Sequence, residues 1–185
     1  MTSEQDLVDG YVRSGVQDGV ATITFFHPKS NSLPGKLLAE LSAAVTDAGK
    51  NPDAKLIVLR SDGDGPFCAG ASFAELQAIQ DAESGKKFFM GFVNLIIAMI
   101  RAPKFVLTRV HGKVVGGGVG IVSVSDFVVA AKGASLRLSE LAVGLGPFIV
   151  GLPIQKKIGL AAFSAMAVDA DWRDAEWGHR HGLYA

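Results

Sequence analysis

The chain has 185 residues, of which 49% are hydrophobic and 19% charged, a composition typical of a globular rather than a disordered protein. Lys and Arg together number 18, as do Asp and Glu, so the formal net charge is zero. A balanced chain offers no broad basic surface for nucleic acid, and the length suits one domain, residues 1–185, rather than two.

Targeting and redox signals point to the cytoplasm. The first ten residues are polar and acidic and lack the basic segment and apolar stretch of a signal peptide. The longest apolar run, 92–100, is shorter than the roughly 20 residues that a membrane span needs, so we expect no membrane association. Cys68 is the single cysteine, which excludes an internal disulfide and favours a reducing compartment.

Hydrophobic patterning predicts alternating strands and helices, hence an α/β fold. Asp18-Gly19 between the first two β-rich runs predicts a hairpin, and Pro34 is placed where a helix start tolerates proline. We expect strands over 11–16, 20–26, 56–59, 105–110, 127–130 and 135–138, and helices over 33–48, 72–80, 86–100, 149–158, 161–168 and 172–179.

Two segments of small residues stand out, 67–73 (FCAGASF) and 114–120 (VVGGGVG), each placed between a predicted strand and a predicted helix. Small residues let a ligand approach the backbone, and a helix start presents free N–H groups to a developing negative charge. Tight packing between strand and helix would also explain either segment alone. A dinucleotide-binding loop fits poorly, because no G-x-G-x-x-G spacing closes around Gly118.

Taken together with two further motifs, these segments give the chain a resemblance to a known family. The first motif is His27-Pro28-Lys29…Asn31-Ser32-Leu33, which is similar to R-P-x-x-x-N-A-L, and the second is Phe67-Cys68-Ala69-Gly70-Ala71-Ser72, which is similar to F-x-A-G-A-D. The third is Val110-His111-Gly112…Gly116-Gly117-Gly118, which is similar to V-N-G-x-x-x-G-G-G. The fourth is Ser139-Glu140-Leu141…Gly144-Leu145-Gly146-Pro147, which is similar to P-E-x-x-x-G-x-x-P. From about Val16 onward the chain therefore resembles the crotonase superfamily, also called the enoyl-CoA hydratase/isomerase family.

The resemblance implies a superhelix of ββα units, with the family's C-terminal helical region short or missing in this chain. It implies an acyl-CoA substrate, of which coenzyme A is a part, so no separate cofactor is expected. It also implies assembly as a homotrimer or hexamer.

The resemblance further implies an oxyanion hole formed by the backbone N–H groups of Ala71 and Gly117. Chemistry beside a thioester builds an enolate oxygen, and two fixed donors would stabilise that charge. Residues expected beside the substrate and its coenzyme A are Lys29, Ala69, Gly70, Ser72, Phe73 and Gly116.

Glu140 matches the position of a catalytic glutamate, whereas Gly120 matches the position of the second glutamate of the hydratases. Gly120 is therefore expected to leave a gap opposite Glu140. A double-bond shift needs one carboxylate that lifts and returns a proton, so isomerase chemistry is favoured. A hydratase with its second carboxylate at Glu75 or Asp126, a decarboxylase, a thioester hydrolase and a non-catalytic acyl-CoA-binding subunit remain alternatives.

Several other departures from the family pattern affect the expected site. Ser72 replaces the usual aspartate. Phe148 and Ile149 either narrow the acyl pocket or, as we favour, pack in the core. We expect His111 to be a hydrogen-bonded structural histidine, and Cys68 to pack rather than to act as a nucleophile. Apart from the pair in His179-Arg180-His181, which we assign to a solvated tail, the four histidines show no ligand-like spacing, so no metal is expected.

Overall fold

Strands and helices alternate along the chain in the computed structural model, which describes residues 3–185, apart from the side chains of residues 6 and 7. The strands are β1 (Tyr11–Gln17), β2 (Val20–Phe26), β3 (Leu56–Ser61), β4 (Val106–Val110), β5 (Val114–Val115), β6 (Phe127–Ala130), β7 (Ser135–Arg137) and β8 (Arg173–Asp174). The helices are α1 (Glu4–Asp9), α2 (Gly35–Lys50), α3 (Phe73–Gln77), α4 (Ala82–Ile100), α5 (Gly117–Val124), α6 (Phe148–Ile158), α7 (Leu160–Asp169) and α8 (Ala175–Arg180), with a short 3₁₀ turn, η1, at Leu141–Val143. The expected α/β class is confirmed.

The predicted hairpin joins β1 and β2. Gln17 and Val20 face each other across the turn, and the two residues between them, Asp18 and Gly19, have φ values of 51° and 80°. A two-residue turn with positive φ at both positions matches the right-handed twist of the strands, which is why Asp-Gly is favoured there.

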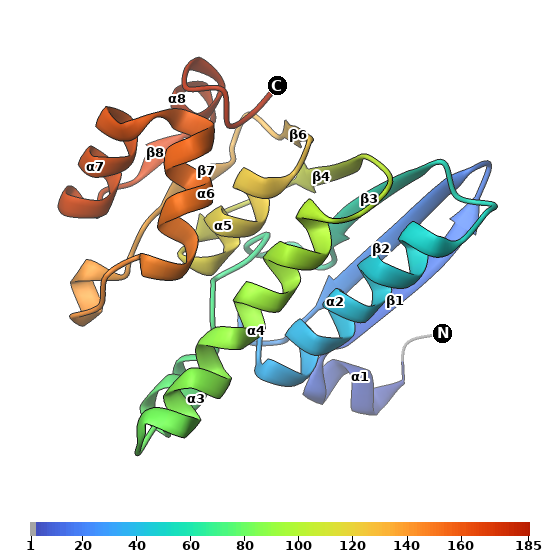
Figure 1. Cartoon of the computed structure of the whole chain (residues 1–185), viewed down its shortest axis with the longest axis horizontal. Helices are drawn as coiled ribbons and strands as arrows, with labels where there is room; N and C mark the ends of the chain where they lie inside the picture. Colours follow the sequence, from blue (N-terminus) through green and yellow to red (C-terminus); the bar gives the residue numbers. More distant parts are fainter. Residues whose placement is uncertain (1–2) are drawn as a thin grey trace.

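A five-stranded sheet in the order β1-β2-β3-β4-β6 forms the larger layer (Figure 1). β1 runs antiparallel to β2, and the remaining neighbours are parallel. Burial alternates along β2 and β3, so that one sheet face, including Ile23, Phe25, Ile57 and Leu59, is fully buried. The parallel arrangement brings the carboxyl ends of β2, β3, β4 and β6 to one edge of the sheet.

A smaller second layer has the strand order β5-β7-β8. Single bridges extend it, since Cys68 pairs in parallel with Val114, and Leu33 with Ala71. Most units of the chain therefore give one strand to the large sheet, a strand or bridge to the second layer, and then a helix. This is the expected ββα repeat.

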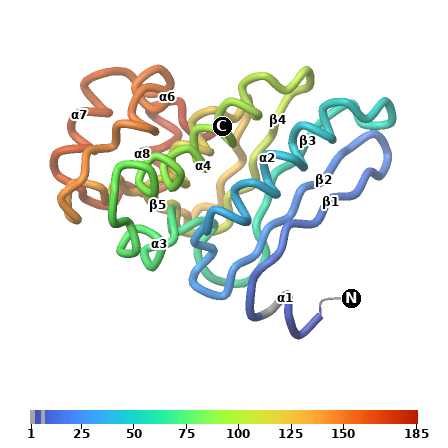
Figure 2. The backbone as a smooth tube through the Cα atoms, turned by 60° about the horizontal axis from the view of Figure 1, so that its bottom comes forward, coloured from blue at the N-terminus to red at the C-terminus, as the bar shows by residue number. Residues whose placement is uncertain are grey.

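The helices pack on one another and on the large sheet. Helix α2 contacts β1, β2 and β3, α4 packs against α2, and α5 packs against α6. In Figure 1, α4 crosses between α2 and the α5–α6 pair. Figures 1 and 2 both show α6, α7 and α8 at the end of the molecule away from the β1–β2 hairpin.

Three helix boundaries differ from those expected by three residues or more. Helix α4 begins four residues before 86, because Asp81 accepts a hydrogen bond from Ser84 N at 2.7 Å and forms a capping box. Helix α3 ends at Gln77 rather than 80. The segment expected to be helical from 172 first forms β8, and α8 starts only after Asp174, whose carboxylate accepts from Trp177 N.

Across the described residues, no helix is both long enough and apolar enough to span a membrane. Residues 1 and 2, which open the segment expected to lack a signal peptide, lie outside the described part.

Candidate functional site

The two segments of small residues lie side by side in the second layer. Cys68 N donates to Lys113 O at 3.2 Å, and Val115 N donates to Cys68 O at 2.9 Å. This parallel bridge pairs Cys68 with Val114, and the same register carried three residues further places Ala71 next to Gly117. The point where a Cβ on the neighbouring Gly70 would stand is 3.5 Å from Gly117 N. Tertiary structure thus joins two segments that lie 46 positions apart in the chain.

The backbone N–H groups of Ala71 and Gly117 are free to bind a ligand. Gly117 is the first residue of α5, and the first N–H groups of a helix have no partner inside it. Within residues 3–185, neither N–H donates to another protein group. The start of a helix also carries a partial positive charge, which favours an anionic atom at this point.

Both residues line one cavity of about 200 Å³. Its lining is largely apolar and aromatic, and the polar side chains on it are those of Ser139 and Glu140. The remaining lining residues are Ala69, Gly70, Phe73, Leu76, Phe88, Phe89, Phe92, Gly116, Val143, Leu145, Gly146, Pro147, Phe148, Ile149 and Val150. An apolar cavity with a few convergent polar groups is typical of a site for a small organic ligand.

Glu140 lies between β7 and η1 and turns its carboxyl group toward the start of α5. Its Oε1 is 3.1 Å from the point where a Cβ on Gly116 would stand. Its Oε2 is buried and has no hydrogen-bond partner among the described residues. Burial raises the pKa of this carboxyl group, and hydrogen bonds with the backbone of Glu140 and Ser139 counter only part of that effect. A half-buried carboxyl group with a raised pKa suits proton transfer at a ligand held in the cavity.

The space beside Gly120 is filled rather than open. A Cβ at this position would stand 2.5 Å from Cγ1 of Val150 and 3.6 Å from Cδ1 of Ile96. The expected gap opposite Glu140 is therefore wrong, because α6 packs a valine side chain against the bare backbone of α5.

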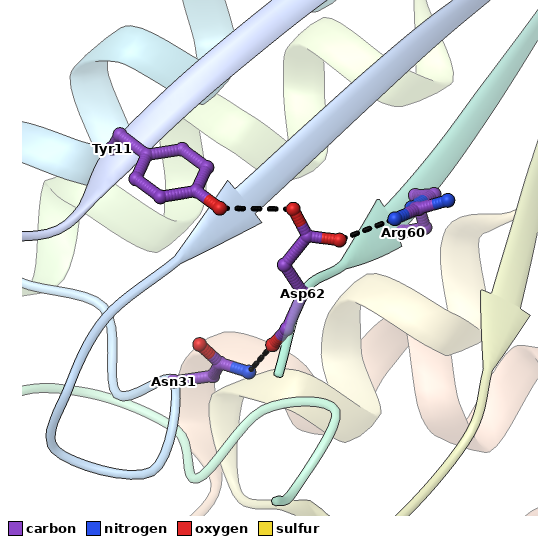
Figure 3. Close-up of polar contacts among 4 residues, drawn as sticks. All are labelled: Tyr11, Asn31, Arg60 and Asp62. Atoms are coloured by element: carbon purple, nitrogen blue, oxygen red, sulfur yellow. Dashed lines mark hydrogen bonds and ion pairs between the residues drawn. The ribbon is translucent and has the colours of Figure 1, made fainter. Parts of the chain in front are cut away.

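A polar cluster at the carboxyl end of β3 holds the loop that leads to the site (Figure 3). Asn31 Nδ2 donates to the backbone oxygens of Asp62 and Pro66, at 2.9 Å each, and its Oδ1 accepts from His27 N at 2.7 Å. The Asp62 carboxylate accepts from Tyr11 OH at 2.9 Å and pairs with Arg60. Burial alone would raise the pKa of Asp62, but the hydrogen bonds from Arg60 and Tyr11 outweigh it and lower the pKa. Asn31 thus fixes both ends of the 62–66 loop, just before Phe67.

Comparison with known proteins decides the family. A family model described as "Enoyl-CoA hydratase/isomerase" matches residues 15–184. The chain belongs to this family, the crotonase superfamily.

Two curated relatives and one solved structure illustrate this membership. A (7aS)-7a-methyl-1,5-dioxo-2,3,5,6,7,7a-hexahydro-1H-indene-carboxyl-CoA hydrolase from Rhodococcus jostii is 33% identical over 83% of this chain and 60% of its own length. A crotonyl-CoA hydratase from Syntrophomonas wolfei is 29% identical over 90% of this chain and 65% of its own. The crystal structure of an enoyl-CoA hydratase from Mycobacterium smegmatis superimposes with a TM-score of 0.89, at 28% identity, over 94% of this chain and 68% of the other.

The crotonase fold expected from the motifs is therefore confirmed. The chain spans less than two thirds of the length of the two curated relatives described above.

The residues that a crotonase motif assigns to the substrate are only partly brought together. Four of them line the cavity, namely Ala69, Gly70, Phe73 and Gly116. Ser72 does not line it but caps α3, where its hydroxyl oxygen accepts from Glu75 N at 3.3 Å. Lys29 is exposed in the loop after β2, and that loop is tied to the site because Leu33 N donates to Gly70 O at 2.8 Å.

The two alternative positions for a second crotonase carboxylate lie outside the cavity. Glu75 accepts a hydrogen bond from Gly35 N at 2.9 Å, at the start of α2. Asp126 accepts from Val106 N at 2.8 Å, at the amino end of β4. Neither side chain lines the cavity. Each instead stabilises the backbone at the start of a nearby helix or strand.

Two expectations about departures from the crotonase pattern are wrong. Both ring nitrogens of His111 are buried without a hydrogen-bond partner in the described part of the chain, so the expected hydrogen-bonded histidine is not found. Phe148 does not pack in the core, since it is 88% exposed, and it is one of the residues that line the cavity. Ile149 does pack partly against the core while also lining the cavity.

Cys68 is fully buried, and burial raises the pKa of its thiol to about 12, which fits packing rather than nucleophilic chemistry. The described residues contain no group of three or more His, Cys, Asp or Glu side chains that could hold a metal ion.

Five further residues line the cavity although no motif assigned them a role: Ser139, Val150 and three phenylalanines of α4, Phe88, Phe89 and Phe92. The helical spacing of the phenylalanines indicates only that α4 has an apolar side. No sequence signal tells whether that side meets the core or a cavity.

Proposed function

We propose that this crotonase is an acyl-CoA enzyme that stabilises a thioester enolate. The N–H groups of Ala71 and Gly117 would bind the thioester oxygen, and Glu140 would act as the single acid/base. The observation that carries the proposal is that two free backbone donors and the half-buried side chain of Glu140, whose Oε2 is buried without a partner among the described residues, line the same apolar cavity.

The proposed chemistry follows from this arrangement. Glu140, ionised, takes a proton from a carbon next to the thioester carbonyl or conjugated with it. The electron pair moves onto the thioester oxygen, where two preformed donors stabilise the charge. Removing one such donor in other enzymes costs about 3–4 kcal/mol of transition-state stabilisation. The protonated Glu140 then returns the proton, to the same carbon or to another along the conjugated system.

The favoured reaction is a shift of a double bond from carbon 3 to carbon 2 of an enoyl-CoA. This reaction consumes no water and needs one carboxylate. Two observations support it: among the described residues, Glu140 is the only carboxylate on the cavity lining, and the wall beside Gly120 carries the apolar side chain of Val150.

A thioester or ring hydrolase is the second candidate. The Rhodococcus jostii relative acts, by its name, on a bicyclic carboxyl-CoA. The five phenylalanines on this cavity, Phe73, Phe88, Phe89, Phe92 and Phe148, would suit a rigid ring, because aromatic faces contact flat apolar groups over a large area.

Coenzyme A would extend from the cavity past residues 69–73 toward the loop that carries Lys29. The ammonium group of Lys29 would then meet a phosphate as a point charge. We include assembly as a homotrimer or hexamer in the proposal, as implied by the family.

The test is proton exchange in deuterated water. A saturated acyl-CoA and the 3-enoyl and 2-enoyl thioesters are incubated with the wild type, Glu140→Gln and Glu75→Gln. We expect deuterium at the α-carbon and 3-to-2 isomerisation with wild type and Glu75→Gln, and a loss of about 10²–10⁴-fold with Glu140→Gln.

Unchanged exchange in Glu140→Gln would exclude Glu140 as the acid/base. Binding of acyl-CoA without exchange or turnover in any form would instead support a non-catalytic binder. Release of free coenzyme A, or of a ring-opened thioester, would favour the hydrolase.

A further inference from the structure

Beside two glycines on one side of α5, side chains from other helices form the wall of the cavity. Gly117 and Gly120 are three positions apart and therefore lie on the same side of the helix. The Cβ position of Gly117 is occupied by the ring of Phe92, at 2.4 Å from Cε1 and Cζ, and that of Gly120 by Val150 Cγ1, at 2.5 Å. Phe92 belongs to α4 and Val150 to α6, and both line the cavity.

The polar and apolar parts of the cavity are separated along α5. Glu140 Oε1 and Ser139 Oγ lie 3.1 Å and 3.7 Å from the Cβ position of Gly116, at the start of the helix. Gly120 is one helical turn further on, about 6 Å along the axis. The side chains packed beside Gly120 are those of Val150, which is 4% exposed and lines the cavity, and Ile96, which is 7% exposed and lies outside the lining.

An apolar wall cannot hold a water molecule in place. An ordered buried water needs two to four polar partners, and neither valine nor isoleucine offers one. We infer that Val150 is a specificity-determining residue of this site: it fills the wall beside Gly120, keeps water from it, and so suppresses addition of water to an enoyl thioester while leaving proton transfer by Glu140 intact. This inference rests on the proposed enolate chemistry.

The two competing reactions differ in what they require. Water addition across the double bond of a 2-enoyl thioester forms a C–O bond at carbon 3 and a C–H bond at carbon 2, and consumes one water that must be held and deprotonated. The double-bond shift moves one proton between two carbons and consumes nothing. A dry wall therefore selects the second reaction without any change at Glu140 or in the oxyanion hole.

The experiment exchanges the side chains of the two positions. In the double variant Gly120→Glu/Val150→Gly, the valine no longer occupies the space and a carboxylate enters it. Val150→Gly alone opens the space without a carboxylate. Val150→Thr keeps the shape of the side chain and replaces one methyl group on the wall by a hydroxyl. Ile154→Thr also introduces a hydroxyl on α6, at a fully buried position off the cavity, and in addition shortens the side chain.

Two quantities are measured for each protein: deuterium exchange at the α-carbon, and the 3-hydroxyacyl-CoA formed from a 2-enoyl-CoA. In the double variant we expect the rate of hydroxyacyl-CoA formation, divided by the rate of deuterium exchange, to rise about 100-fold. This is the effect of gaining one general acid/base. A smaller rise is expected in Val150→Thr, and none in Ile154→Thr. If the double variant does not fold, the comparison of Val150→Thr with Ile154→Thr becomes the test.

Exchange that persists in the Val150 variants without any gain in hydroxyacyl product would overturn the role of Val150 and leave the enolate chemistry standing. A wild type that already forms hydroxyacyl-CoA as fast as it exchanges protons would also overturn it. Absence of exchange in the wild type would reject the proposed function, and this inference with it.

Discussion

Glu140 Oε1 lies 3.1 Å from the point where a Cβ on Gly116 would stand. Gly116 has a φ of 53°, a conformation that residues with a side chain rarely adopt. Glycine at this position therefore serves both the turn into α5 and the close approach of the carboxyl group to the start of that helix.

Gly116→Ala should displace the carboxyl group of Glu140. We expect kcat to fall by about 100-fold, the loss that a shift of about 1 Å in a catalytic group can cause. The control is Gly182→Ala, which also has a positive φ but open space around its Cβ. Equal losses of activity in the two variants would show that backbone strain, and not the position of Glu140, is responsible.

The raised pKa of Glu140 predicts how stability depends on pH. Because its folded-state pKa lies above that of the unfolded chain, the folded state binds more protons between the two values. The free energy of unfolding contributed by this group is thus largest below the unfolded pKa and falls as pH rises through the folded pKa. Glu140→Gln should remove this component, which is measured as the difference between the two proteins in chemical denaturation across pH.

The same shift predicts the acid limb of the activity profile. Glu140 must be ionised to take a proton, so kcat/KM should fall with decreasing pH at a value above that of an ordinary glutamate. An acid limb at or below the ordinary glutamate value would show that a different group is titrating.

Gly117→Ala should force the ring of Phe92 to move, because the new Cβ would come within 2.4 Å of it. Overpacking of this kind costs about 1–3 kcal/mol of unfolding free energy, and the displaced ring would enter the cavity. The double variant Gly117→Ala/Phe92→Leu should recover much of the stability while the backbone N–H stays in place. Denaturation and exchange rates measure both effects, and an unchanged stability of the single variant would contradict the packing described here.

Asn31→Ala should loosen the 62–66 loop and lower the activity of a site it does not touch. The change leaves the backbone oxygens of Asp62 and Pro66 and the N–H of His27 without their partner, at a cost of about 2–3 kcal/mol. Asn94→Ala, at an exposed position on α4, is the control. If Asn31→Ala were as stable as that control, the cluster in Figure 3 would not be holding the loop.

Much of the fold could be predicted from local patterns. The strand over 20–26 and the Asp18-Gly19 turn follow from local residue patterns, and the structure confirms both. The residue at which a helix begins was harder to predict. At α4 the cap is Asp81, which accepts from Ser84 N, and several nearby polar residues could have taken that role. β5 and β8, of two residues each, carry too short a pattern to be recognised.

The candidate site was predictable where residue type itself carries the information. Small residues at Ala71 and Gly117 and an acid at Glu140 stand in recognisable motifs, and the structure places all three on one cavity. The role expected for them remains a prediction. His111 and Phe148 were misjudged, because a motif does not tell which atoms surround a side chain.

The sequence by itself determined the family, the α/β class and the three positions on which the proposed chemistry depends, because these follow from residue types at fixed spacing. Only the tertiary structure decided what stands beside Gly120. A glycine specifies that a side chain is missing but not which group takes its space. The group that takes the space beside Gly120 depends on how α6, which begins 28 residues after Gly120, packs against α5. Val150 fills the position, and so the chemistry of that wall belongs to a contact between helices rather than to any motif.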